Sequence, residues 1–127
     1  MTDRLKPTDA ELEILRALWA HGPGTVREVH EHLEDKPPRG YTTVLKLLQI
    51  MTDKKLVRRN EKQRAHVYKA AVTAEQVRGK YLKHLLNTAF DNSTGQLVMQ
   101  ALSTRPASKE ELAEIRRMLD QIEGETK

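Results

Sequence analysis

Hydrophobic residues recur at helical spacing in six stretches of this 127-residue chain, and turn-forming residues separate the stretches. In the third stretch, Val44, Leu47, Leu48 and Met51 stand at positions i, i+3, i+4 and i+7, which is one stripe of an amphipathic helix. The pattern predicts helices over residues 9–21, 26–33, 42–54, 73–90, 94–102 and 110–123. Between the third and fourth helices, residues 56–60 and 65–70 are rich in strand-forming residues, so they predict a short hairpin.

Four of the predicted helices begin with the same signature, a hydroxyl residue followed three positions later by Glu or Gln. In such a capping box the hydroxyl accepts a hydrogen bond from the amide of the third helical residue, whose side chain bonds back to the amide of the cap. The four pairs are Thr8 with Glu11, Thr25 with Glu28, Thr73 with Gln76, and Ser108 with Glu111. Because each pair precedes a periodic run, the pairs predict where these helices begin.

The order of these elements predicts the fold class. Three short helices followed by a hairpin is the order of a winged helix-turn-helix, whose third helix enters the major groove of DNA. We therefore expect a mainly α protein, with a winged helix-turn-helix DNA-binding domain of three helices and a β-hairpin wing over residues 1–72. A three-helix dimerisation domain is expected over residues 73–127. Within it, Gly79 costs the helix about 1 kcal/mol relative to Ala and is a candidate hinge.

The last three predicted helices carry broad apolar faces, although aromatic residues make up only 4% of the chain. Short amphipathic helices bury little surface by themselves, but they can bury it against a second copy of the chain. We therefore expect a homodimer with two-fold symmetry. The expected dimerisation residues are Tyr81, Leu82, Leu85, Leu86, Phe90, Leu97, Val98, Leu102, Leu112, Ile115, Leu119 and Ile122.

The formal net charge of +4 is concentrated around the predicted hairpin. Residues 54–69 contain seven Lys or Arg and one Glu, whereas residues 71–127 contain eight residues of each sign. A concentrated cationic segment is typical of a surface that contacts phosphates, and here it follows a helix with a polar outer face. The candidate DNA contacts are Arg39, Thr42, Thr43, Lys46 and Gln49 at the helix, and Arg58, Arg59, Lys62 and Arg64 in the hairpin.

Other kinds of function find little support in the sequence. The absence of Cys removes thiolate metal sites and cysteine nucleophiles, and the five histidines have no acid or Cys partner at ligand spacing. No Gly-rich phosphate loop or nucleophile motif occurs, so we expect no enzyme activity, no cofactor and no metal. No stretch approaches the roughly 18 apolar residues of a membrane span, and no secretory segment begins the chain. We expect a cytoplasmic protein without membrane insertion.

Four segments carry a resemblance to a known family: AELEILRALW, TVREVHEHL, YTTVLKLLQIM with KKLV after it, and RAHVYKA. They are similar to the penicillinase and methicillin-resistance repressors, the BlaI/MecI type, and the resemblance covers residues 5–122. It implies a homodimeric bacterial transcriptional repressor that binds a palindromic operator in double-stranded DNA. By position, it places Tyr41, Thr42, Thr43 and Lys46 nearest the groove and Arg64 in the wing.

The resemblance also implies candidate routes of induction. Family members that are released by a membrane sensor-protease are cut at an Asn-Phe bond in the dimerisation region, and the matching pair here is Gln100-Ala101. The changed residues leave the inducing signal open. A membrane sensor-protease is a candidate partner, and β-lactam resistance genes or another operon under such control are candidate targets. The cysteine cluster of copper-responsive relatives is absent, because the chain has no Cys.

Two other functions stay open at this point. A winged helix can serve protein contact inside a larger assembly, and Leu45 and Ile50 offer some apolar surface for it, but the hairpin cations favour DNA. A ligand-responsive regulator of the MarR type also binds DNA through a winged helix. Such regulators place a dimer-forming helix before the winged unit, whereas here the dimer-forming segment follows it.

Overall fold

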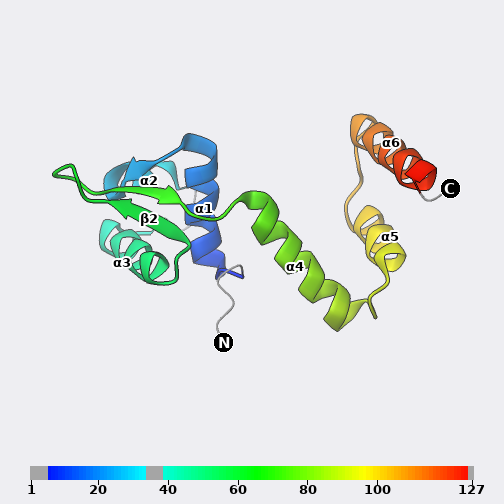
Figure 1. Ribbon diagram of the computed structural model, residues 1–127, viewed down its shortest axis with the longest axis horizontal. Helices are drawn as coiled ribbons and strands as arrows, with labels where there is room; N and C mark the ends of the chain where they lie inside the picture. Colours follow the sequence, from blue (N-terminus) through cyan, green and yellow to red (C-terminus); the bar gives the residue numbers. More distant parts are fainter. Residues whose placement is uncertain (1–5, 34–38, 126–127) are drawn as a thin grey trace. The chain divides into compact units, whose positions relative to one another are not determined.

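The computed structural model describes residues 6–33 and 39–125 (Figure 1), and the chain divides into two compact units, residues 1–84 and residues 85–127. The N-terminal unit contains α1 (Asp9–His21), β1 (Gly24–Thr25), α2 (Val26–His32), α3 (Tyr41–Asp53), β2 (Val57–Asn60) and β3 (Val67–Ala70). The helix α4 (Ala74–Ala89) crosses the border, and α5 (Thr94–Thr104) and α6 (Lys109–Glu125) follow. The predicted order of helices and hairpin is confirmed.

The predicted helix starts are confirmed by the hydrogen bonds that cap them. At α1, Glu11 N donates to Thr8 Oγ1 at 3.2 Å, and Thr8 N donates to Glu11 Oε1 at 2.8 Å. The same reciprocal bonds begin α2, α4 and α6 at the other three capping boxes. These bonds satisfy amides that have no partner within their own helix, so the local sequence alone defines where the helices begin.

The sheet has three antiparallel strands in the order β1-β3-β2, so β3 lies in the centre. The sequence predicted only the hairpin of β2 and β3. In the structure, Arg59 of β2 pairs with Tyr68 of β3. The additional strand β1 pairs Gly24 with Tyr68, and its two residues are too few to show the alternation of a strand. The hairpin strands are also shorter than predicted and begin at Val57 and Val67.

The core of the N-terminal unit joins the apolar stripes of its helices to the sheet. On α3, the predicted inward residues Val44, Leu48 and Met51 are each 0% exposed, and Leu47 packs partly buried beside them. Tyr68 at the centre of the sheet is 1% exposed. Because one stripe of α3 is fixed in this core, its opposite face is turned to solvent.

A tight turn joins α3 to the wing. Leu56 N donates to Met51 O at 2.9 Å, and Lys55 N donates to Thr52 O at 3.1 Å, which are the two bonds of a Schellman motif. Lys55 takes the left-handed φ of 66° that this motif requires. Since Met51 and Leu56 are both buried, the turn fixes the direction in which the wing leaves the helix.

The first half of α4 packs on the winged unit. Val77 is 1% exposed in the core, and Tyr81 packs against that core while its hydroxyl donates to the Pro7 carbonyl. The Trp19 indole Nε1 donates to Val72 O at 2.9 Å, just before α4. The border between the compact units therefore falls 12 residues after the border that we predicted between the functional domains. The helix continues through Gly79 without a break.

The C-terminal unit has an open apolar surface. Among its described residues, 85–125, none is fully buried. Seven of its large apolar side chains are exposed, from 38% at Leu102 to 62% at Met118. Others are half-buried: Leu86, Phe90, Leu97, Leu112 and Ile115. An apolar surface of this extent is typical of a protein that associates with another chain.

Candidate nucleic-acid interface

The outer face of α3 is polar and open. Thr42, Thr43, Lys46 and Gln49 are all exposed, on the side opposite the buried stripe. The helix begins after Gly40, which supplies no side-chain cap, and its first turn contains no acidic residue. Neither the cap residue nor the first turn therefore neutralises the backbone amides and the positive end of the helix dipole, which favours a phosphate at this end of α3.

The residues that lead into α3 are held by the two preceding helices. Arg39 Nε lies 3.4 Å from Glu13 Oε2 on α1, and the Arg39 carbonyl oxygen lies 2.7 Å from His30 Nε2 on α2. Tyr41, which is 49% exposed, packs edge-on against the His30 ring with 6.3 Å between ring centroids. The Arg39 side chain is thus engaged with α1, and its contact with DNA stays a prediction.

The wing carries the cations that the sequence indicated, but they are not equivalent. Arg58, Lys62 and Arg64 are exposed. Arg59 instead pairs with Glu61, and a hydrogen bond with the Tyr68 side chain, together with the Glu61 charge, raises the pKa of Arg59. Arg59 is therefore the cation best held to the sheet, and the other three are the ones best placed to reach a phosphate.

A partly buried ion pair that the sequence did not predict fixes the end of α3. Glu11 is 1% exposed, and its Oε2 lies 2.9 Å from Lys54 Nζ at the C-terminal cap of α3. Burial by itself raises the pKa of the Glu11 carboxyl, but hydrogen bonds from Lys54 and Thr8 and the Lys54 charge lower the pKa below its ordinary value. A signal was available, because Glu11 stands on the inward stripe of α1 with Leu15 and Leu18.

The described part of the chain offers no other chemistry at this surface. Residues 6–33 and 39–125 contain no group of three or more His, Cys, Asp or Glu side chains arranged to hold a metal ion. None of the helices in the same residues has the length and apolar character needed to cross a membrane.

The arrangement defines a class of protein, the winged helix-turn-helix proteins, because α3 is buried on one side and open on the other and a cationic hairpin follows it. The fold is shared with a solved structure, the solution structure of the DNA-binding domain of the repressor BlaI. The TM-score is 0.50, over 60% of this chain and 93% of that domain, with 22% sequence identity.

The particular family follows from the sequence as a whole. The family model of the penicillinase repressor matches residues 7–121, and the chain belongs to that family. It is 31% identical over 117 residues to the transcriptional regulator BlaI of two strains of Mycobacterium tuberculosis, CDC 1551 / Oshkosh and ATCC 25618 / H37Rv, which covers 91% of this chain and 84% of theirs. The resemblance found in the sequence is thus confirmed, as is the expectation of a transcriptional regulator and not an enzyme.

Proposed function

We propose that the chain is a DNA-binding transcriptional repressor that places α3 in the major groove of its operator. The observation that carries this proposal is the open polar face of α3, which lies beside exposed wing cations in the same unit. Thr42, Thr43, Lys46 and Gln49 have side chains that can bond base edges or phosphates. Arg58, Lys62 and Arg64 lie on one hairpin and are suited to hold the phosphate backbone beside the groove.

We propose further that the repressor acts as a homodimer on a palindromic site. The apolar faces of the C-terminal unit support this, because residues such as Leu85, Leu119 and Ile122 leave 42%, 53% and 47% of their surface exposed in a single chain. A two-fold axis would bury these faces and bring two copies of α3 to successive major grooves, roughly 34 Å apart. Residues 1–72 would then read DNA, while residues 73–127 would dimerise.

Release from the operator is proposed to involve the region of Gln100-Ala101 in α5, with a membrane sensor-protease as the partner. Both residues are exposed, but they lie inside a helix in which Thr104 Oγ1 donates to Gln100 O at 2.7 Å. A protease binds its substrate as an extended strand, so this helix must open locally before cleavage. The operon under control would be one for β-lactam resistance or another that answers to such a protease, in the cytoplasm of a bacterium.

The first test is a titration of the protein against the DNA upstream of its own gene, at two salt concentrations, with random duplex as competitor. We expect saturable binding that persists in the presence of the competitor. The reason is that contacts with base edges add affinity for the operator to the affinity that phosphate contacts give for any duplex. Equal affinity for the upstream DNA and the random duplex, with binding lost at the higher salt concentration, would contradict a sequence-specific repressor. It would favour a protein-contact role for α3, on which Ile50 is 39% exposed.

Two substitutions separate base reading from phosphate binding. Lys46→Ala should weaken operator binding by about tenfold or more while changing random-duplex binding much less, because α3 faces the bases.

Arg64→Ala should weaken binding to the operator and to random duplex, and should reduce the slope of log affinity against log salt concentration by about one unit. Arg105→Ala, which removes an exposed cation between α5 and α6, is the matched control and should change neither. An unchanged salt slope in the Arg64 variant would refute its phosphate role.

A further inference from the structure

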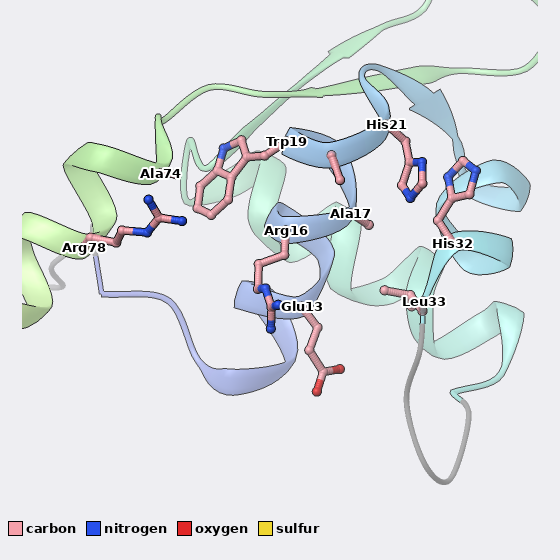
Figure 2. Close-up of a pocket in the computed structure, with 10 residues that line it drawn as sticks. Glu13, Arg16, Ala17, Trp19, His21, His32, Leu33, Ala74 and Arg78 are labelled. Carbon is pink, nitrogen blue, oxygen red and sulfur yellow. The ribbon is translucent and has the colours of Figure 1, made fainter. Parts of the chain in front are cut away.

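A groove on the winged unit has no role in the function argued above. It is formed by α1, α2 and the beginning of α4, and it encloses about 660 Å³. Pockets for small organic ligands are typically about 300–1,000 Å³. Figure 2 shows Trp19 and Arg78 at one end, the histidines at the other, and Arg16 and Glu13 along α1 between them.

The lining combines a ring surface with unpaired positive charge. Trp19 is half-buried, and its Nε1 is already bonded to Val72 O, so the indole offers its face and not its polar atom. Arg16 and Arg78 are exposed, and neither forms an ion pair with another residue that the structure describes. The small side chains of Ala17, Ala20 and Ala74 leave room beside them.

The opposite end of the groove adds polar groups. The rings of His21 and His32 stack with their centroids 3.8 Å apart, and both are exposed. Among residues 6–33 and 39–125, the only acidic residue of the lining is Glu13, and its Oε2 lies 3.4 Å from Arg39 Nε. With two arginines and one acid that is already paired, the groove favours an anion.

We propose that this groove binds a small organic anion with a planar ring, an aromatic carboxylate, and that its occupation lowers affinity for the operator. The ring would stack on Trp19, and the carboxylate would pair with Arg16 and Arg78. The second half of the proposal rests on the proposed function, whereas ligand binding does not.

The connection to DNA passes through Glu13 and Arg39. Arg39 comes directly before Gly40 and α3, and it is one of the candidate DNA contacts. A ligand carboxylate that neutralises Arg16 and Arg78 removes positive charge that repels Arg39, so the Arg39 side chain is held more firmly beside Glu13. Arg39 is then held on α1 and is less available to a phosphate.

Ligand binding is measured first, without DNA. The full-length protein is titrated with 1-naphthoate by calorimetry, and the indole N–H signal of Trp19 is followed by NMR, since this is the one tryptophan of the chain. We expect saturable binding that shifts this signal. The uncharged 1-naphthamide should bind the parent protein at least tenfold more weakly than 1-naphthoate does. 1-Naphthoate should bind Arg16→Gln and Arg78→Gln at least tenfold more weakly than it binds the parent protein. Arg27→Gln, which removes an exposed cation of α2 outside the groove, should bind like the parent protein.

Operator binding is then measured with and without saturating 1-naphthoate. A decrease in operator affinity of about threefold or more is expected for the parent protein, and the decrease should disappear in Glu13→Gln although that variant still binds the ligand.

Absence of saturable naphthoate binding, or equal affinity for the naphthoate and the amide, would overturn the groove as an anion site even if operator binding is intact. Ligand binding with an unchanged operator affinity would overturn the coupling. A protein that binds naphthoate with the expected arginine dependence but never binds its operator would contradict the repressor function and leave the anion site standing.

Discussion

Leu119→Glu should convert the protein to a monomer and lower its affinity for a palindromic operator by a factor of about 10² to 10⁴. Leu119 lies on the apolar face of α6 and is 53% exposed in the single chain. Burial of a Leu side chain stabilises an interface by about 1.5–3 kcal/mol. Because a two-fold interface contains the residue twice, the substitution removes this contribution twice and buries two carboxylates. Without the dimer, the second half-site no longer benefits from a high effective concentration.

The matched control for this experiment is Gln121→Glu. It adds the same charge to α6, two residues further along and therefore on the opposite face of the helix. Sedimentation equilibrium should find a dimer for this control and for the parent protein, and a monomer for Leu119→Glu. A Leu119→Glu protein that remains dimeric and retains its operator affinity would show that this face of α6 does not form the interface.

Glu11→Gln should reduce the free energy of unfolding of the winged unit by about 1.5–3 kcal/mol, the range for a hydrogen bond to a charged group. The carboxylate is almost fully buried, and it joins the start of α1 to Lys54 at the end of α3. The amide of Gln can still accept from Thr8, so the loss isolates the contact with Lys54. Lys54→Met should be more destabilising, because it leaves an unpaired carboxylate in the core.

The stability that the pair of Glu11 and Lys54 contributes should depend on pH. The pKa of Glu11 is lower in the folded protein than its ordinary value of 4.5, so the unfolded chain binds the proton more tightly. The contribution of the pair to stability is therefore fully present above about pH 4.5 and is lost as the pH falls through the folded pKa. Denaturant melts of the parent and Glu11→Gln should differ at neutral pH and converge in acid. The control Glu31→Gln removes an exposed carboxylate of α2 and should have little effect. A constant difference across this pH range would contradict an ionised Glu11.

The candidate interface was predictable to the extent that it depends on local sequence. The polar side of α3 follows from the spacing of Val44, Leu48 and Met51, because burying that stripe exposes Lys46 and Gln49. The cationic wing follows from composition. The different states of Arg58 and Arg59 could not be predicted, since Arg59 is distinguished by Tyr68 across the hairpin and by Glu61.

The sequence by itself determined the helices, the hairpin and the family. Periodicity and capping boxes act within a few residues, so they can be recognised without any tertiary contact. Only the tertiary structure decided which distant residues meet. It paired β1 with β3, joined Trp19 to Val72 and Tyr81 to Pro7, and enclosed Glu11 with Lys54. These contacts link residues that are 42 or more positions apart, and they depend on how the apolar stripes pack together, which no local pattern specifies.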